Sequence, residues 1–460
     1  MFFEQIVRQD IGCAAYIVGS NDAAEAAVVD PRIDMTGEIL ELLAREGLRL
    51  RYIVETHNHA DHVAGHHELR ARTGAEIAVH AAAGVDYPHR ALRHGDELAL
   101  GEVRLRVIHT PGHRPEHIAL AVLDTSRAAE PWLVLTGDSL FIGDVARPDL
   151  AIDGREGAGA LFHSLHQGLL ELPEGTLVFP GHVAGSLCGR VNNRMTGTTI
   201  GFERRHNPAL TITDEPAFVA YMTQSLPQRP PNMARIVRLN QSAEPLAQPA
   251  LRLLSLDQLE PLRQDGATLL DVRSAAAFAA GHLPGSFSVD LHGGQFQNRV
   301  GLAVPLDRPL VLVAETEADA EAAARALAVI GVERIAGGLV GPPETASLVL
   351  PPEITAGELH RRLSADPALQ LVDVREPSEW REGHIAGASN IPFYRVGEAA
   401  ATLDRERPLA LICASGKRSM IAASILQGQG MTPLNVAGGM ESWQAAGFPV
   451  ALEAAVAAAN

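Results

Sequence analysis

Residues 56–62 read Thr-His-Asn-His-Ala-Asp-His and follow the apolar run Leu-Arg-Tyr-Ile-Val at 50–54. Three imidazoles and a carboxylate so close together cannot all lie on one face of a strand or a helix. The stretch therefore predicts a loop folded around a group that binds nitrogen and oxygen donors. A transition metal fits that requirement better than the alternative, a histidine-rich surface loop.

Further residues of metal-ligand type occur later in the chain, each after an apolar run and a glycine turn. They are His113 after Gly112, Asp138 after Gly137 and His182 after Gly181. Apolar runs of this length followed by glycine predict strands that end at those points. Because strand ends can converge on one edge of a sheet, the sequence predicts that these side chains meet the 56–62 loop there.

The order of these signatures, T-H-x-H-x-D-H, P-G-H, G-D and P-G-H, resembles the metallo-β-lactamase superfamily across roughly residues 1–240. The resemblance implies an α/β fold, the αββα sandwich. Hydrophobic spacing and Gly47 at its C-terminus predict a helix at 36–46. A second helix is expected at 66–73, with its N-terminus beside the metal. Strands are predicted at the ranges 13–18, 26–29, 50–54, 76–80, 97–108 (a hairpin), 118–122, 132–136 and 176–179.

Chain length, composition and net charge limit the class of protein. A chain of 460 residues predicts about three domains, and 46% hydrophobic residues suffice to build their cores. A net charge of -17 argues against nucleic-acid binding. The three cysteines are too few for a disulfide framework, and we find neither a signal peptide nor an apolar run long enough for a membrane span. We therefore expect a cytoplasmic protein. We also expect it to form a homo-oligomer.

Two proline-rich stretches, 225–232 and 243–249, end the first part of the chain. Beyond them the sequence repeats with a period of about a hundred residues: D-V-R at 271–273 recurs at 373–375, and G-H at 281–282 recurs at 383–384. The repeated elements resemble rhodanese sulfurtransferase domains. We predict a metallo-β-lactamase-like domain at 1–245 and two rhodanese-like domains at 250–345 and 351–453.

In the second repeat the strand 409–412 ends at Cys413, and an apolar helix begins after the loop that carries Lys417 and Arg418. A cysteine between a strand end and a helix N-terminus, beside two cations, predicts a stabilised thiolate. The C-x-x-G-x-R-S match to active rhodanese loops implies that Cys413 carries a sulfane sulfur, with Lys417 and Arg418 attracting an anionic acceptor. The alternative is a buried structural cysteine.

The first repeat departs from this pattern. Its alignment with the second repeat places Ala314 opposite Cys413, and the loop that follows carries the acids Glu315, Glu317 and Asp319. With neither a nucleophile nor a positive loop, this copy is predicted to be catalytically inactive and to act as a spacer.

The number and type of the predicted ligand residues do not decide which metal binds. The full ligand set suits two zinc ions and thioester hydrolysis, as in the similar glyoxalase II enzymes. The subset His57, His113 and Asp138 suits one Fe(II) with open positions for oxygen and substrate. The attached sulfurtransferase favours iron, because persulfide oxidation makes sulfite and sulfite can accept the sulfur of a rhodanese persulfide.

The whole arrangement resembles the persulfide dioxygenase and rhodanese fusions of bacterial sulfide detoxification. The resemblance implies that His57, His113 and Asp138 bind mononuclear Fe(II). It also implies that Arg147 holds a substrate anion or braces the metal loop, and that Arg190 binds the substrate. Other residues would line a vacant second metal site or support the first; they are His59, Asp61, His62 and His182.

Two further cysteines have separate interpretations. Cys188 lies six residues beyond His182 and is either a persulfide carrier near the metal or a packing residue in a turn. Cys13, in an early strand, is interpreted as a core residue.

We thus expect iron-dependent oxidation of a thiol persulfide, of glutathione, coenzyme A or a similar thiol, to sulfite, followed by transfer of sulfur to sulfite at Cys413 to give thiosulfate. The alternative is a glyoxalase II-like binuclear zinc thioester hydrolase fused to a sulfurtransferase. No nucleic-acid or membrane partner is expected.

Overall fold

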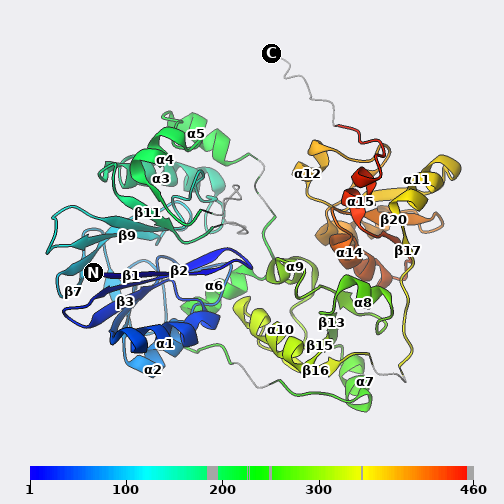
Figure 1. The fold of residues 1–460 in the computed structure, drawn as a ribbon, viewed down its shortest axis with the longest axis horizontal. Coiled ribbons are helices and arrows are strands. Elements are labelled where there is room, and N and C mark those ends of the chain that lie inside the picture. The colour runs from blue at the N-terminus through cyan, green and yellow to red at the C-terminus, as the bar shows by residue number, and fades with distance from the viewer. Residues whose placement is uncertain (184–194, 225, 227, 248–250, 343–345, 453–460) are drawn as a thin grey trace. The chain divides into compact units, whose positions relative to one another are not determined.

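The computed structural model describes residues 1–460 except 184–194, 225, 227, 248–250, 343–345 and 453–460 (Figure 1). It divides into two compact units. The first comprises Met1–Gln248 and Leu327–Glu333, and the second comprises Pro249–Ala326 and Arg334–Asn460. Among the helices of the described residues, none has the length and apolar character needed to span a bilayer.

The first unit contains two six-stranded sheets. One sheet has the order β1(Phe2–Arg8), β2(Cys13–Ser20), β3(Glu25–Val29), β4(Arg49–Val54), β5(Glu76–His80) and β6(Arg90–Leu92). The other has the order β12(Thr198–Thr199), β11(Leu177–Pro180), β10(Leu133–Gly137), β9(Ile118–Asp124), β8(Val103–His109) and β7(Glu97–Leu100). Both sheets mix antiparallel and parallel pairs, such as β1 with β2 and β10 with β11.

The two sheets pack face to face, and helices cover their outer faces (Figure 1). Tyr16 and Val18 of the first sheet share a core with Leu105 and Leu120 of the second. Alternate residues of β2, such as Ile17, face the outer core beneath the helices. Because β2 is buried on both faces, its sequence is apolar throughout rather than alternating.

Helices α1(Thr36–Glu46) and α2(His66–Thr73) lie over the first sheet, and both end as the sequence predicts. Gly47 and Gly74 adopt the left-handed conformation that stops each helix, with φ of 66° and 74°. The helices over the second sheet are α3(Gly154–His166), α4(Ile200–His206) and α5(Glu215–Met222). A last helix, α6(Met233–Gln241), completes the unit. The predicted αββα sandwich is confirmed.

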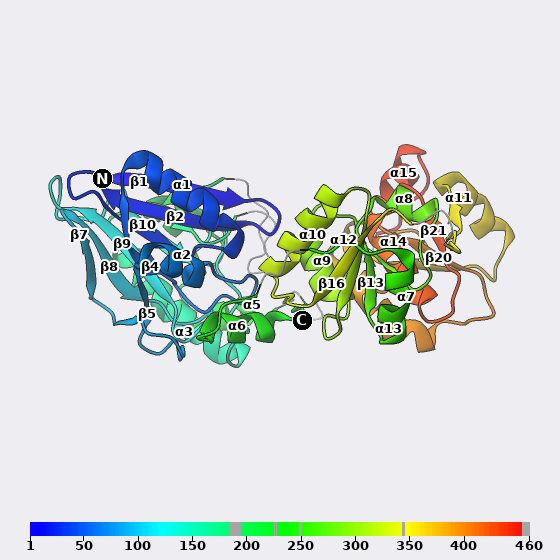
Figure 2. The same ribbon diagram turned by 90° about the horizontal axis from the view of Figure 1, so that it is seen from below.

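The second unit contains two smaller sheets in which the strand pairs are parallel (Figure 2). The first repeat has the strand order β14(Phe287–Ser288), β13(Thr268–Asp271), β15(Leu310–Ala314) and β16(Ile335–Val340). The second has the order β17(Glu353–Ile354), β21(Leu434–Val436), β20(Leu409–Ile412), β18(Gln370–Asp373) and β19(Ser389–Asn390). The predicted pair of rhodanese-like α/β domains is confirmed.

Helices surround these sheets in corresponding positions of the two repeats. In the first repeat they are α7(Leu256–Gln264), α8(Ala275–Ala279), α9(Phe296–Ala303) and α10(Glu317–Val329). In the second they are α11(Ala356–Ala365), α12(Pro377–Glu382), η3(Phe393–Arg395), α13(Val396–Ala399), η4(Ala400–Thr402), α14(Lys417–Gln427) and α15(Gly439–Ala445).

The D-V-R element that marks the repeat forms a buried ion pair. Asp373 and Arg375 are joined at 2.6 Å, and Arg375 also donates a hydrogen bond of 2.7 Å to the carbonyl oxygen of Gly383. In the first repeat Asp271 and Arg273 form the same pair at 2.6 Å. The pair ties the end of the first long strand of each repeat to the glycine turn after the next helix.

Removing one partner of this pair tests its role in stability. Asp373→Asn leaves the buried guanidinium of Arg375 without its carboxylate, so the free energy of unfolding of the second repeat should fall by about 3 to 5 kcal/mol. Urea unfolding followed by tryptophan fluorescence measures this, since Trp380 and Trp443 belong to that repeat. The exposed residue Asp265 provides a control, and Asp265→Asn should change the value by less than about 0.5 kcal/mol. Equal midpoints for the two variants would contradict the role assigned to the pair.

Candidate metal centre and cysteine loop

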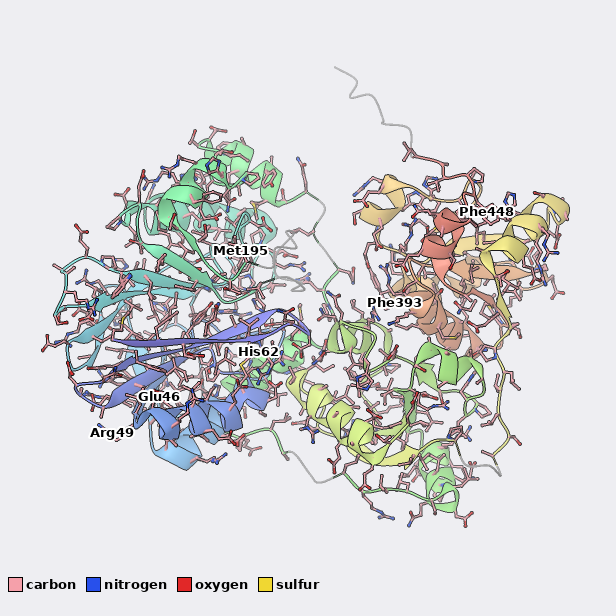
Figure 3. The ribbon with its side chains drawn as sticks, in the orientation of Figure 1. Glu46, Arg49, His62, Met195, Phe393 and Phe448 are labelled. Atoms are coloured by element: carbon pink, nitrogen blue, oxygen red, sulfur yellow. The ribbon has the colours of Figure 1, made fainter. Side chains whose placement is uncertain are left out.

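The predicted metal ligands of the first unit lie in loops at one edge of its sheets, where Figure 3 labels His62. Two glycines let these loops approach one another. A Cβ atom on Gly137, whose φ is 48°, would lie 2.7 Å from the hydroxyl oxygen of Thr56. A Cβ on Gly181 would lie 2.8 Å from a carboxylate oxygen of Asp138. The glycine that precedes each ligand is therefore required by the close packing of the loops.

His57, His113 and Asp138 come together as a buried two-histidine, one-carboxylate group whose donor atoms lie within 4.8 Å of one another. The distance from the carboxylate to His57 Nε2 is 3.9 Å and to His113 Nε2 is 3.5 Å. Within the described part of the chain, His57 Nε2 and Asp138 Oδ2 are buried without any hydrogen-bond partner. Buried ligand atoms that face one another and lack hydrogen-bond partners fit a bound metal ion.

Hydrogen bonds on the far side of each ring fix which nitrogen faces this group. His113 Nδ1 lies 2.9 Å from the backbone carbonyl of Arg147, to which it donates, so His113 Nε2 carries the lone pair. Thr56 donates its hydroxyl hydrogen to Asp30, and the same oxygen accepts from His57 Nδ1 at 2.9 Å. Burial lowers the pKa of both histidines, which favours the neutral form that binds metals.

A second group, Cys13, Asp61, His62 and His182, lies beside the first. The Cys13 sulfur is 3.5 Å from Asp61 and 3.6 Å from both His62 Nδ1 and His182 Nε2. Ligand atoms around a tetrahedral zinc ion lie about 3.3 to 3.6 Å apart, so this set also suits a metal ion. His182 connects the groups, because its Nδ1 atom is 2.7 Å from Asp138 Oδ1.

Cys13 belongs to two clusters, and His59 lies apart from the residues with which the sequence grouped it. Cys13 is a buried core residue, as the sequence predicts, and it also opens β2 at the edge of the metal loops and lines the second group. His59 lies 3.2 Å from Asp30 and 3.3 Å from Glu55, in a group apart from Asp61, His62 and His182. Burial opposes a charge on His59, but these two carboxylates outweigh it and raise the pKa of His59 well above its usual value.

His117 supports the first group but was not identified from the sequence. His117 Nε2 accepts a hydrogen bond of 2.8 Å from the backbone N–H of Asp138, and its other ring nitrogen lies 2.8 Å from the Thr110 hydroxyl. Burial lowers the pKa of His117 to about 3, so the ring is neutral and its tautomer is set. The spacing of His113 and His117 is the one local pattern that pointed to it.

Arg147 has its guanidinium paired with Asp149 at 2.7 Å, and it is 3% exposed. Its backbone carbonyl holds His113 in place, so it braces the metal loop. Cys188 and Arg190, which the sequence suggested as persulfide carrier and substrate ligand, lie outside the described residues.

In the second unit Cys413 directly follows β20 and is 1% exposed. Its sulfur accepts hydrogen bonds from the backbone N–H of Gly416 at 3.1 Å and from the hydroxyl of Ser419 at 3.4 Å. The predicted arrangement of a cysteine beneath a helix N-terminus is therefore present. Donors aimed at the sulfur stabilise a thiolate more than a thiol.

The register of the sheets confirms the alignment of the two repeats. Asp271 pairs with Val313 in the first sheet, and Asp373 pairs with Ile412 in the second. The next positions, Ala314 and Cys413, are thus equivalent.

Lys417 and Arg418, which the sequence placed in the loop after Cys413, form the first turn of α14, and both are already engaged by carboxylates. Both terminal nitrogens of the Arg418 guanidinium contact Glu379, at 2.6 and 2.7 Å. Lys417 Nζ lies 3.7 Å from Asp290, which belongs to the first repeat.

Two family descriptions match the chain. Residues 8–182 match the metallo-beta-lactamase superfamily, and residues 255–341 and 355–446 each match the rhodanese-like domain. A crystal structure of a metallo-beta-lactamase from Staphylococcus aureus aligns with 74% of this chain and 99% of its own, with a TM-score of 0.67 and 27% identity.

Curated relatives cover the first unit. The chain is 32% identical to the mitochondrial persulfide dioxygenase ETHE1 of Bos taurus over 202 residues, which is 44% of this chain and 72% of the bovine protein. It is 34% identical over 172 residues to a hydroxyacylglutathione hydrolase of Rhodospirillum rubrum, covering 36% of this chain and 60% of that protein. The chain therefore belongs to the ETHE1 persulfide dioxygenase family of the metallo-β-lactamase superfamily, and two rhodanese-like domains follow its family domain.

Proposed function

We propose that this chain oxidises a low-molecular-weight thiol persulfide with oxygen to give sulfite and the free thiol, and that Cys413 then produces thiosulfate from sulfite. One observation carries the proposal: a buried two-histidine, one-carboxylate group with orphaned donor atoms occurs in the same chain as a cysteine cradled by hydrogen-bond donors. The overall oxidation balances as RSSH + O₂ + H₂O → RSH + SO₃²⁻ + 2H⁺.

His57, His113 and Asp138 would hold one Fe(II). Iron in such a triad supplies redox chemistry and leaves positions for oxygen and substrate. The protein supplies the geometry: Thr56 and Arg147 orient the two rings, and His182 holds one oxygen of Asp138 so that the other faces the histidines.

The second reaction takes place at Cys413. The Cys413 thiolate attacks the outer sulfur of a thiol persulfide, takes that sulfur to form a cysteine persulfide and releases the thiol. Sulfite then attacks the outer sulfur of Cys413, the S–S bond breaks, and thiosulfate leaves with the transferred sulfur. The Gly416 amide and the Ser419 hydroxyl stabilise the thiolate that departs in this step. Glutathione, coenzyme A or a similar thiol carries the sulfur in this proposal.

A binuclear zinc thioester hydrolase is the second candidate. It is favoured by the four donors of Cys13, Asp61, His62 and His182, whose spacing suits a second metal, and by the likeness to the hydroxyacylglutathione hydrolase of R. rubrum. We favour the dioxygenase because the more completely covered relative bears that name and because sulfite links the two reactions chemically.

Metal content separates the two candidates. We expect anaerobically purified protein to contain one iron per chain and to consume oxygen with glutathione persulfide. His113→Ala removes a ligand, so iron content and oxygen uptake should fall by about 100-fold or more. The exposed His206 lies outside the group, and His206→Ala should change neither. Two zinc ions per chain, with thioester hydrolysis and no oxygen uptake, would refute the dioxygenase.

The product distribution tests the division of labour. Cys413→Ser removes the sulfur carrier and leaves the metal group untouched. The rate of oxygen uptake should therefore stay within about twofold of that of the unaltered protein. Sulfite should accumulate in place of thiosulfate, as measured by ion chromatography of the products. Loss of oxygen uptake in this variant would show that the two reactions do not occur at separate sites.

A further inference from the structure

The cysteine loop faces an electrostatic problem if its co-substrate is an anion. Sulfite carries negative charge, yet both cations of the loop are countered by carboxylates, Arg418 by Glu379 and Lys417 by Asp290. An ion pair offers an incoming anion much less attraction than a free cation does. The loop by itself therefore supplies little unopposed positive charge to hold sulfite beside Cys413.

The first repeat reaches this loop. Asp290, the partner of Lys417, lies between β14 and α9 of the first repeat. Just before it, the backbone N–H of Ser288 donates a hydrogen bond of 3.0 Å to the hydroxyl of Ser424 on α14. The short helix η3 packs against both α9 and α14, and Figure 3 labels its first residue, Phe393, between them. The segment from β14 to α9 thus packs against α14, the helix that follows Cys413.

Arg299 on α9 is the cation that this segment adds. It is half-buried and donates a hydrogen bond of 3.2 Å to the carbonyl oxygen of Gly293. In the part of the chain that the structure describes, no carboxylate lies within 4.0 Å of its guanidinium nitrogens. Burial and then the charge of Arg418 lower the pKa of Arg299, whereas Cys413 and Asp290 act in the opposite sense.

A half-buried arginine beside a second arginine is costly unless an anion offsets the charge. The guanidinium also presents several donors in one plane, which matches the oxygens of an oxyanion. The neighbouring ionisable groups are Arg418, Cys413 and Asp290, of which Arg418 is paired with Glu379 and Asp290 with Lys417. Arg299 itself therefore keeps a positive charge that an anionic ligand beside Cys413 would neutralise.

We propose that Arg299 binds the sulfur oxyanion that reacts at Cys413, sulfite in the proposed function, so that the first rhodanese-like domain contributes a substrate ligand to the second. Asp290 has the complementary effect, because it lowers the positive potential of Lys417 at the same place. The inference rests on the proposed function for the identity of the ligand. It assigns a binding role to the repeat that lacks the thiol.

Steady-state thiosulfate formation from glutathione persulfide and varied sulfite gives the first readout. Loss of one charged hydrogen-bonding partner predicts a KM for sulfite about 10- to 100-fold higher in Arg299→Gln, with kcat within about twofold. Arg299→Lys keeps the charge and should recover part of the loss. Asp290→Asn frees Lys417 and should lower the KM. Arg325 is an exposed arginine of the same repeat that pairs with Glu321, and Arg325→Gln should leave the KM unchanged.

Alkylation of Cys413 in the full chain provides a readout that needs no sulfur chemistry. Iodoacetate is an anion and iodoacetamide is neutral, so the ratio of their rates at Cys413, followed by peptide mass spectrometry, reports the local potential. The ratio should fall several-fold in Arg299→Gln, rise in Asp290→Asn and stay constant in Arg325→Gln. If the chain makes no thiosulfate, the proposed function fails, and this ratio still decides whether Arg299 attracts anions.

A purely structural role predicts other results. In that case kcat would fall with an unchanged KM for sulfite, and the alkylation ratio of Arg299→Gln would equal that of the unaltered protein. Either outcome overturns the inference. If Arg299→Gln does not fold, Arg299→Lys and Asp290→Asn still decide it, since the inference requires that Asp290→Asn lower the KM and raise the ratio.

Discussion

The first unit depends on a single buried charge, the carboxylate of Asp138 at the end of β10. Its residue is 0% exposed, and an isolated carboxylate at such a depth would cost several kcal/mol. Burial raises its pKa, but the charge and hydrogen bond of His182 outweigh that effect and hold the pKa well below the usual value. The loops of four strands therefore bring imidazoles to this point, and the small size of Gly137 and Gly181 lets them approach one another closely.

Some local elements of the first unit could be predicted because each depends on residues that are close together in the sequence. Helices α1 and α2 have the predicted bounds, and in α1 helical spacing and the left-handed Gly47 mark the helix and its end. The ligand loops were readable because each follows an apolar strand. Strand β1 was missed, because most of its residues are only partly buried and its sequence shows no clear alternation. The helices over the second sheet were likewise not predicted.

Contacts between distant segments could not be predicted from one sequence. Cys13 enters the second metal-type group because the backbone N–H of Ala14 bonds to the carbonyl of Gly181, which places the start of β2 beside His182. His59 turns toward Asp30, which follows the distant strand β3, as well as toward Glu55, four residues before it in the chain. In the second unit the alignment of Ala314 with Cys413 was predictable from the repeat, whereas the pairing of Lys417 with Asp290 depends on how the repeats pack.

The Asp–Arg pair has a consequence for how the two repeats diverged. It occurs in both copies with matching geometry, down to the hydrogen bond that its arginine donates to a glycine carbonyl. Only one copy has kept a thiol at the strand end. A domain without a nucleophile still needs the groups that close its sheet, so the positions identical in both copies indicate what folding requires. Positions that differ between the copies, such as Ala314 and Cys413, are where their functions differ. Each repeat therefore serves as an internal reference for the other.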